Sequence, residues 1–539
     1  MGAESGPSLV RNEHGVTAIW RGINLYPGSN PAEYARRKAR IFSCSPGTLV
    51  FVPSVGLGYG LPELLSRLPP GSLVLCVEAH QPMMALAMAQ GLPRDSRLLI
   101  LRADNEEVVA RTLREMGEWR FRNVAEVALC AGYRLSPALY ASMRRALENQ
   151  VHEHWRNRLT LIALGSLQVR NLFSNITLFP LAGDFASLST SMPVIVAGAG
   201  PSLEELLPTI RAVRNDVLLL AVDTALPRLV TESLRPDLVV ALEAQVANLQ
   251  DFLPALSPGG TLLVCELSSH PSAARLFGSN VRFFSSEFAP LRLFARMAGA
   301  RILPCPFPAL GSVGVAALNA AVRLTTGEIF LTGLDFSYPR SLTHARGTPY
   351  HLSALVQAAR LSPPDDRSFR ALSARKTTIA EDKNGQPVLT DPVLMSYREN
   401  LRRVAAAASP RVSDAGGSGL ELGAPRVGAL ELRERVRGAS SRSTPLERAA
   451  PPLCSPEAAL GFIRSEEEIL RRGAAILTEA LSAETPSEDC LSFLDEADYA
   501  WVHFPDSRQD RPPGKSLLAR VGAAARYYGE RLRRLESLF

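Results

Sequence analysis

Two glycines that follow an apolar run are the first residues whose type and spacing could do chemistry. Segment 194–203 reads VIVAGAGPSL, so four apolar residues lead into Gly198 and Gly200 and then into a helix-forming sequence. Without a Cβ atom, these glycines let the backbone approach a ligand closely, and the free N–H groups at the start of the following helix attract an anion. The pattern predicts a phosphate-binding turn. Ser202 and Glu205 also match a Ser-x-x-Glu capping box, typical of an ordinary strand-to-helix turn, and this alternative stays open.

Acidic residues follow three further apolar runs that are expected to be strands. Asp223 and Glu243 directly follow two of them, Asp335 follows the third after a Gly-Leu pair, and Gln245 and Asn248 lie close behind Glu243. The carboxyl ends of parallel strands lie at one edge of a sheet, which is where open α/β folds bind ligands. The sequence therefore predicts one crevice, although each acid taken alone is typical of a loop or a helix cap. The three runs are 217–222, 238–242 and 329–332.

A long polar segment after Asp335 carries the candidate catalytic bases. Residues 337–351 are too many for a tight connection, so they predict a lid or a binding segment. His344 and His351 lie within it, and a neutral imidazole is a suitable base near neutral pH. His344 either takes a proton in the reaction or bonds a backbone carbonyl, and Asp335 either orients it or replaces it.

Composition limits the classes of function. The chain has 539 residues, too many for one hydrophobic core, and its 46% hydrophobic and 21% charged residues are typical of a soluble globular protein. The net charge of +6 is modest, and without a Lys/Arg tract it does not support nucleic-acid binding, although it fits a small anionic ligand.

Cysteine usage and the absence of a long apolar run indicate the compartment. The seven cysteines are odd in number and lack a Cys-x-x-Cys pair, so reduced thiols are expected rather than a disulfide framework or a zinc site. The start of the chain does not resemble a signal sequence, and no apolar run reaches about 18 residues. We expect a cytoplasmic protein with no membrane span.

The order of the patterns predicts an α/β fold of two Rossmann-like units followed by a C-terminal helical region. In the first unit, the strand 48–52 leads into the Gly-rich stretch 56–60, and Glu78 ends the next strand. This spacing resembles a nucleotide-binding turn, but Pro53 and Tyr59 depart from the fingerprint, so we assign this unit no ligand. The expected divisions are 1–150, 151–189 as a helical connector, 190–425 as the central domain, and 426–539 as the helical region.

Two local patterns refine this division. Asn171 and Asn175 lie one helical turn apart in the connector, facing either the cleft or solvent. An Asn384-Gly385 pair between two short β-prone segments predicts a hairpin within the central domain.

The motifs of the central domain together resemble a known family. The series GAGPSL from residue 198, AVDTAL from 221, PDLVVALE from 236, GSV from 311 and LTGLDFSY from 331, with Thr-His-Ala at 343–345, looks like the motility accessory factor (Maf) proteins. These proteins share a domain with the archaeal MptE-like 6-hydroxymethylpterin diphosphokinases. The resemblance implies that the central domain is similar to single-Rossmann sialyltransferases.

The resemblance also implies roles for individual residues. Gly198, Gly200 and Ser202 would contact the phosphate of a CMP-activated nonulosonic acid, and Asp223 and Thr224 would lie beside the ribose or a metal ion. At Glu243 the sequence departs from the Asp-Pro dipeptide of many members, while Gln245 and Asn248 match the polar positions that follow. The full expected donor-binding set is Gly198, Gly200, Pro201, Ser202, Asp223, Thr224, Glu243, Gln245, Asn248 and Ser312.

Three functions follow as hypotheses. The first is a glycosyltransferase that moves the acidic sugar to Ser or Thr hydroxyls of flagellin, with His344, Asp335 and His351 as the catalytic candidates. The second is pyrophosphoryl transfer from ATP, with Mg²⁺ held by Asp223, Glu243 and Asp335. The third is a non-catalytic flagellin-binding accessory protein. The long N-terminal part and the helical tail favour a protein acceptor.

Overall fold

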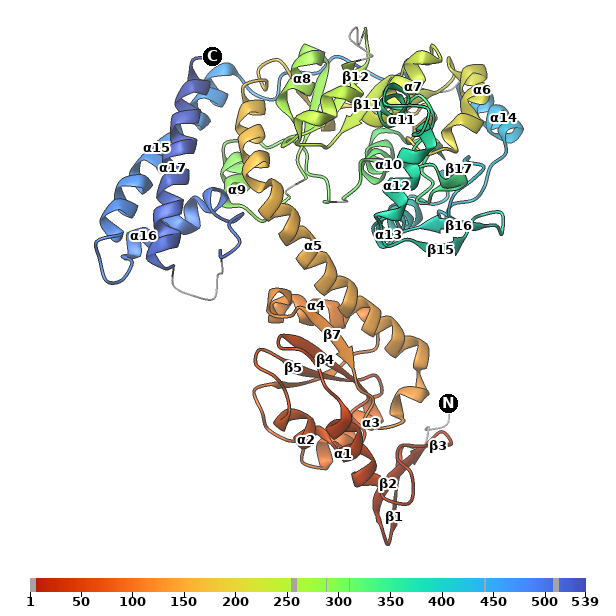
Figure 1. Cartoon of the computed structure of the whole chain (residues 1–539), viewed down its shortest axis with the longest axis vertical. Coiled ribbons are helices and arrows are strands. Elements are labelled where there is room, and N and C mark those ends of the chain that lie inside the picture. Colours follow the sequence, from red (N-terminus) through yellow and green to blue (C-terminus); the bar gives the residue numbers. More distant parts are fainter. Residues whose placement is uncertain (1–5, 254–258, 287, 310, 441–442, 508–512) are drawn as a thin grey trace. The chain divides into compact units, whose positions relative to one another are not determined.

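The computed structural model describes residues 6–253, 259–286, 288–309, 311–440, 443–507 and 513–539 (Figure 1). The chain forms two compact units, residues 1–160 and 161–539. Helix α5 (Pro137–Ile176) contains the boundary between them. Among the described residues, no helix is long and apolar enough to cross a membrane.

The first unit is built on a four-stranded parallel sheet in the order β6-β5-β4-β7. Its strands are Thr48–Pro53 (β4), Leu73–Glu78 (β5), Leu98–Arg102 (β6) and Asn123–Glu126 (β7), and its helices before α5 are Pro31–Ile41 (α1), Leu61–Ser66 (α2), Gln81–Ala89 (α3) and Glu106–Met116 (α4). A separate antiparallel sheet joins Ser8–Asn12 (β1), Gly15–Trp20 (β2) and Ile23–Asn24 (β3). Every residue of β4 and β5 is buried, as expected for central strands of a parallel sheet.

The Gly-rich stretch of this unit packs against the unit itself. A Cβ atom on Gly56 would lie 2.4 Å from the hydroxyl of Tyr26, and one on Gly60 would lie 2.7 Å from the carbonyl oxygen of Ala35. Glu78 accepts hydrogen bonds from the amide of Val55 and from the hydroxyl of Ser54. These glycines thus permit close packing inside the unit.

The second unit is built on an eight-stranded sheet in the order β17-β14-β9-β10-β11-β12-β13-β8, in which every pairing is parallel. The strands are Gly183–Asp184 (β8), Val194–Ala197 (β9), Leu218–Val222 (β10), Leu238–Ala241 (β11), Leu262–Glu266 (β12), Val281–Phe284 (β13), Ile329–Thr332 (β14) and Val412–Asp414 (β17).

The strand order creates a switch point beside β9. From β9 the chain lays down β10 to β13 successively on one side, and it then returns to place β14 on the other side of β9. The connections that leave β9 and β14 therefore diverge to opposite sides, which opens a crevice between their carboxyl ends. The glycine turn predicted from the sequence follows β9, and Asp335 follows β14.

Several helices and one hairpin surround the sheet. They are Leu203–Val213 (α6), Leu226–Thr231 (α7), Pro271–Phe277 (α8), Arg292–Gly299 (α9), Val313–Leu324 (α10), Pro349–Val356 (α11), Pro364–Ser373 (α12), Pro392–Ala407 (α13) and Ala429–Ser440 (α14). The predicted hairpin is confirmed as Thr378–Glu381 (β15) paired antiparallel with Pro387–Thr390 (β16). Gly385 has φ +75° in its turn, a conformation that favours glycine.

The end of α5 is held to the sheet by two buried asparagines. Asn171 donates to the carbonyl oxygens of Ala244 and Ser268, and Asn175 donates to those of Leu267 and Ser269. Both side chains are buried, so the expectation that they face the cleft or solvent was wrong. Their amides instead satisfy loop carbonyls that would otherwise be buried without partners.

The C-terminal region completes the hydrophobic core of the second unit. Helices Pro456–Ala480 (α15) and Lys515–Glu536 (α17) lie side by side, and Glu488–Glu496 (α16) lies against α15 (Figure 1). Buried residues on α15 and α17, including Ile463 and Tyr528, belong to the same cluster as the strands of the large sheet. Glu466 of α15 is buried and forms an ion pair with Arg296 of α9 at 2.6 Å.

Candidate functional site

A cavity of about 700 Å³ lies at the carboxyl ends of β9 and β14, where the strand order switches. Its walls come from the glycine turn, the start of α10, the segment after β14, the start of α13 and the loop between α12 and β15. The side chains and backbone that line it are Gly198, Ala199, Gly200, Val222, Thr224, Ser312, Val313, Gly314, Gly333, Leu334, Asp335, Phe336, Ser337, Tyr338, Thr343, His344, Arg375, Lys376, Asp391, Pro392, Val393, Leu394 and Tyr397.

The glycine turn is glycine-rich because β14 approaches it closely. The amide of Gly200 donates to the carbonyl oxygen of Gly333 at 2.8 Å. A Cβ atom on Gly198 would lie 2.2 Å from that oxygen, and one on Gly200 would lie 2.5 Å from Oδ2 of Asp335. The two glycines are therefore needed for contact with the neighbouring strand end, and both also line the cavity.

The start of α6 is capped by a carboxylate from β14. The amide of Ser202 donates to Oδ2 of Asp335 at 2.9 Å, the Ser202 hydroxyl donates to Oδ1, and the amide of Gly333 donates to that hydroxyl at 3.0 Å. No capping box forms with Glu205, because the Ser202 side chain makes no bond to the helix. Ser202 and Pro201 are buried and outside the cavity lining, and the Ser202 amide and hydroxyl are both bonded to Asp335, so the predicted contact of Ser202 with a donor phosphate stays a prediction.

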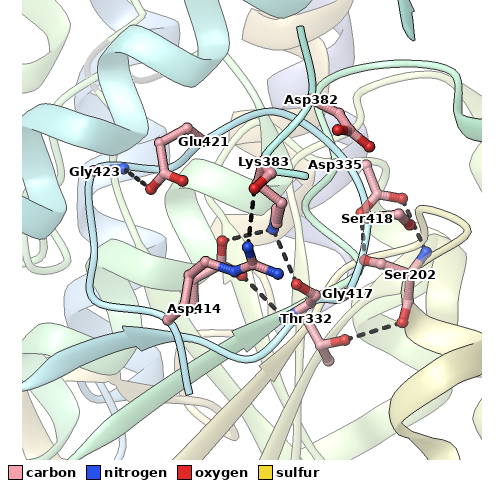
Figure 2. A network of polar contacts seen from close by, with 12 residues as sticks. Ser202, Thr332, Asp335, Asp382, Lys383, Asp414, Gly417, Ser418, Glu421 and Gly423 are labelled. Carbon is pink, nitrogen blue, oxygen red and sulfur yellow. Dashed lines mark hydrogen bonds and ion pairs between the residues drawn. The ribbon is translucent and has the colours of Figure 1, made fainter. Parts of the chain in front are cut away.

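A buried ion pair lies next to this cap. The Nζ atom of Lys383, in the turn of the β15–β16 hairpin, lies 2.6 Å from Oδ2 of Asp414 and 3.1 Å from the carbonyl oxygen of Gly416. Both charged side chains are 1% exposed. Figure 2 shows this pair beside the pair of Ser202 and Asp335. Burial raises the pKa of Asp335 to about 6, although the Ser202 hydrogen bonds and the Lys383 charge oppose the shift.

The positive end of a helix faces the cavity. Ser312, Val313 and Gly314 form the start of α10, and all three line the cavity. Ser312 is the N-cap residue, and its side chain makes no capping bond to the helix. The first N–H groups of a helix have no partner within the helix and carry a partial positive charge, so this end of the cavity suits a phosphate.

The two predicted histidine bases have different surroundings. His344 lines the cavity, and burial together with the positive charge of Arg375 lowers its pKa to about 4, so its imidazole is neutral at pH 7. Its Nδ1 lies 3.3 Å from the hydroxyl oxygen of Thr343. His351 lies outside the lining, and its Nδ1 accepts a hydrogen bond from the amide of Gly347 at 3.1 Å. That nitrogen holds the turn before α11, and the role of His351 as a base stays a prediction.

The polar residues after β10 and β11 form a second group, of which only Thr224 lines the cavity. Asp223 is buried and accepts hydrogen bonds from the side chain of Asn248 at 3.0 Å and from the amide of Thr224 at 2.8 Å. Burial and the charge of Asp223 raise the pKa of Asp251, which the sequence patterns did not indicate, to about 7. The predicted donor contacts Glu243 and Gln245 are exposed outside the lining.

The predicted metal ligands do not come together. Within the described ranges, no group of three or more His, Cys, Asp or Glu side chains could hold a metal ion. Asp335 is turned toward Ser202, and Asp223 is turned toward Asn248, so these acids and Glu243 do not converge on one point. The three-carboxylate magnesium site predicted from the sequence is therefore not formed, and the residues present do not fit that ion.

The sequence patterns gave no individual role to several polar residues of the cavity, including Tyr338, Arg375, Lys376 and Asp391. The Tyr338 hydroxyl donates to Oδ2 of Asp391 at 2.5 Å, and Nη1 of Arg375 donates to the Tyr338 hydroxyl. One signal was present, because Asp391 precedes Pro392 at the start of a helical pattern, but nothing local indicates that this cap faces the glycine turn.

Comparison with known proteins gives the class of the domain and then the fold of the whole chain. Residues 167–341 match the family model described as 6-hydroxymethylpterin diphosphokinase MptE-like. Over nearly the whole chain, the fold is that of the Maf glycosyltransferase from Magnetospirillum magneticum AMB-1, with a TM-score of 0.53, 16% identity, and coverage of 99% of this chain and 90% of that one. The predicted α/β fold and the resemblance to the Maf and MptE-like proteins are thus confirmed.

Two relatives in sequence come from Treponema pallidum (strain Nichols), and both carry the description "Uncharacterized protein". One is 28% identical over 566 residues, which cover 98% of this chain and 96% of the relative. The other is 31% identical over 147 residues, which cover 25% of this chain and 37% of the relative. The first match spans nearly the whole length of both chains.

Proposed function

We propose that this chain is a glycosyltransferase that moves a sugar from a nucleotide donor to a hydroxyl group. The observation that carries the proposal is the cavity itself, where the positive end of α10 and the neutral imidazole of His344 line one space at the switch point of a parallel sheet. A group that stabilises a departing phosphate and a base that takes a hydroxyl proton are the two parts that such a transfer requires.

The donor we propose is a CMP-activated nonulosonic acid, the class implied by the resemblance to Maf proteins. Its phosphate would lie at Ser312–Gly314, where the first N–H groups of α10 attract an anion. This assignment moves the phosphate from the start of α6, whose Ser202 amide is bonded to Asp335. The cavity volume of about 700 Å³ is within the usual range for a small-molecule site.

The proposed reaction is a displacement at the anomeric carbon of the sugar. The acceptor hydroxyl oxygen forms a bond to that carbon, while the bond from the carbon to the phosphate oxygen breaks and its electron pair leaves with CMP. His344 takes the hydroxyl proton, since its lowered pKa keeps the ring unprotonated at pH 7. The N–H groups at the start of α10 stabilise the leaving phosphate.

The acceptor we propose is a Ser or Thr side chain of flagellin. Helices α11 and α12 and the connection between them, which we call the lid helices, support a protein acceptor, because they expose large apolar side chains. The exposed fractions are 87% for Val356, 86% for Leu361 and 68% for Phe369. Exposed apolar side chains that lie together are typical of protein-binding surfaces.

One alternative is pyrophosphoryl transfer from ATP, favoured by the description of the matched family model. That reaction depends on Mg²⁺ bridging the phosphates, and the described residues do not provide a carboxylate cluster for it. The other alternative, a non-catalytic accessory protein that binds flagellin, has the same exposed lid surface in its favour.

The experiment offers the purified full chain either CMP-N-acetylneuraminic acid with unmodified flagellin or ATP with 6-hydroxymethylpterin, each with and without Mg²⁺. We expect release of CMP and a mass increase of flagellin, both lost in His344→Ala and retained in His351→Ala, a matched histidine outside the cavity. Release of AMP from ATP without consumption of the CMP-sugar would establish the diphosphokinase instead. Turnover of neither nucleotide, with flagellin still bound, would establish the accessory protein.

A further inference from the structure

Two cationic residues lie side by side in the sequence and line one edge of the cavity. Arg375 and Lys376 occupy the short connection between α12 and β15 and are both exposed. Asp335 accepts from Ser202, and Asp391 uses Oδ1 to cap α13, accepting from the amides at 393 and 394 at 2.8 and 2.9 Å, while its Oδ2 lies 3.5 Å from Nη1 of Arg375. This edge therefore carries two cations beside the one carboxylate of Asp391, which leaves a net positive charge.

Arg375 is held in place by groups that leave most of its donors available. Its Nη1 donates to the Tyr338 hydroxyl and lies 3.5 Å from Oδ2 of Asp391, and its guanidinium lies 5.6 Å from the centre of the Tyr338 ring. Within the described ranges, Nε and Nη2 of Arg375 have no acceptor, and the ammonium of Lys376 forms no ion pair. A planar guanidinium fixed at one nitrogen is well suited to bind a carboxylate with the others.

The charge of the surrounding segment supports the same conclusion. Residues 337–376 contain seven basic and two acidic residues, a net charge of +5, which is almost all of the +6 carried by the whole chain. An excess of one sign around a cavity raises the local concentration of ligands with the opposite sign. Of the seven basic residues, Arg375 and Lys376 line the cavity, so the segment favours an anionic group at their edge of it.

We propose that Arg375 and Lys376 bind a carboxylate on the transferred sugar, at a place separate from the phosphate site at the start of α10. The inference rests on the proposed glycosyltransferase function and adds the residues that recognise the negative charge of the sugar. Two positive regions in one cavity select donors with two separate anionic groups. Nucleotides that carry an acidic sugar therefore bind, and nucleotides that carry a neutral sugar do not. Arg375 and Lys376 are specificity-determining residues in this assignment.

The position of Arg375 connects donor recognition to the base. Its positive charge is one of the two causes that lower the pKa of His344, so the two side chains are close enough to interact. A carboxylate bound to Arg375 offsets that charge, and the pKa of His344 then rises. A donor with the carboxylate therefore raises the pKa of His344 further than the nucleotide alone, whose phosphate lies at the start of α10.

The test compares three probes by titration calorimetry on the full chain: CMP, CMP-N-acetylneuraminic acid and UDP-N-acetylglucosamine. The variant is Lys376→Gln, with Arg360→Gln as the matched control, because Arg360 is an exposed cation of the same segment outside the cavity lining. We expect Lys376→Gln to weaken binding of the acidic sugar nucleotide about tenfold and to change CMP binding less than twofold. Arg360→Gln changes neither, and the neutral sugar nucleotide does not bind detectably.

A second measurement uses the ring resonances of His344 in an NMR pH titration. The pKa of His344 rises more when CMP-N-acetylneuraminic acid is bound than when CMP is bound, and this difference is lost in Arg375→Gln. Equal weakening of CMP and the CMP-sugar by Lys376→Gln would overturn the inference and assign this edge to the phosphate, leaving the proposed function intact. If the wild-type chain binds neither cytidine ligand, the proposed function fails and this inference with it.

Discussion

At the scale of single residues, the contact between the glycine turn and Asp335 determines the shape of the cavity. The turn was predicted to wrap a phosphate, but its amides at Gly200 and Ser202 are bonded to the end of β14. A carboxylate thus occupies the helix start that an external anion would otherwise occupy. The ligand is therefore left with the opposite wall of the cavity, formed by the start of α10 and by the segment after β14.

The first prediction concerns Gly200→Ala. The new Cβ atom would lie 2.5 Å from Oδ2 of Asp335 and 2.8 Å from the carbonyl oxygen of Gly333, so one strand end has to move. We expect a loss of about 1–3 kcal/mol in the free energy of unfolding, measured by urea denaturation. The control is Gly461→Ala in α15, where a Cβ atom meets nothing within 4 Å and alanine should stabilise the helix by about 0.5–1 kcal/mol. Equal effects of the two substitutions would contradict the close approach.

The second prediction concerns the pH dependence of stability at His344. Its pKa is lowered from 6.5 to about 4, so folding favours the neutral ring. The corresponding stability is present above pH 6.5 and is lost as the pH falls from 6.5 toward 4, on the order of 2–3 kcal/mol. In His344→Gln this contribution is missing, so the difference in unfolding free energy between the wild type and the variant should shrink over that range. A difference that stays constant from pH 7 to pH 4 would show that the ring is not buried as a neutral group.

At the scale of elements, the β15–β16 hairpin is attached to the sheet through one buried charge. Lys383 in the hairpin turn reaches Asp414 at the end of β17, and Asn384 donates to the carbonyl oxygen of Gly417. Arg375 lies three residues before this hairpin, and Asp391 directly follows it. The ion pair therefore sets the position of two groups at the edge of the cavity.

The third prediction tests this attachment with Lys383→Met. Removing the cation leaves Asp414 buried without its partner, and we expect a loss of about 3–5 kcal/mol in the free energy of unfolding. The double variant Lys383→Met/Asp414→Leu removes both charges and should recover much of that loss. Arg370→Ala, which breaks an exposed pair with Asp366, serves as the control and should leave the unfolding midpoint unchanged within error. If Lys383→Met behaves like this control, the pair is not buried.

The fourth prediction tests the lid helices as the surface that meets the acceptor. Val356→Ser and Leu361→Ser change exposed side chains outside the cavity lining, so donor binding should stay within twofold of the wild type. We expect the KM for flagellin to rise about fivefold or more, because a substantial apolar contact is removed. Met88→Ser, at an exposed apolar position in the first unit, is the control and should leave this KM unchanged. An unchanged KM in the lid variants would exclude this surface from acceptor binding.

The elements were largely predictable from the sequence because their signals are local. Strand β14 has the bounds expected from its apolar run, and the hairpin follows from Asn384-Gly385. The partners across the cavity were not predictable, since Asp335 caps a helix that begins more than 130 residues earlier in the chain. Arg375 is similar, because nothing in its neighbourhood indicates that the lid returns to the glycine turn. The spacing of apolar residues predicts each helix and strand, whereas tertiary packing determines which of their ends lie together.

At the scale of the whole molecule, each unit has hydrophobic clusters of its own. The described buried clusters of the first unit draw on residues between 18 and 151, and that of the second on residues between 169 and 535. The proposed donor site lies entirely in the second unit, between residues 198 and 397. We therefore expect the donor to stabilise the second unit against unfolding and to leave the stability of the first unit unchanged.

The fifth prediction follows from this separation. Three of the four tryptophans, Trp20, Trp119 and Trp155, lie in the first unit, and Trp501 lies in the second. In a Trp501→Phe variant, tryptophan fluorescence reports unfolding of the first unit alone, while calorimetry reports both. We expect two thermal transitions, one for each unit. Saturating CMP-N-acetylneuraminic acid should raise the midpoint temperature of the second unit only, because a ligand stabilises the unit that binds it, and this transition is not seen by fluorescence. The converse control is Phe51→Ala, which creates a cavity in the core of the first unit. It should lower the midpoint temperature only of the transition that tryptophan fluorescence reports. A single transition that shifts with both the ligand and Phe51→Ala would show that the two cores unfold as one.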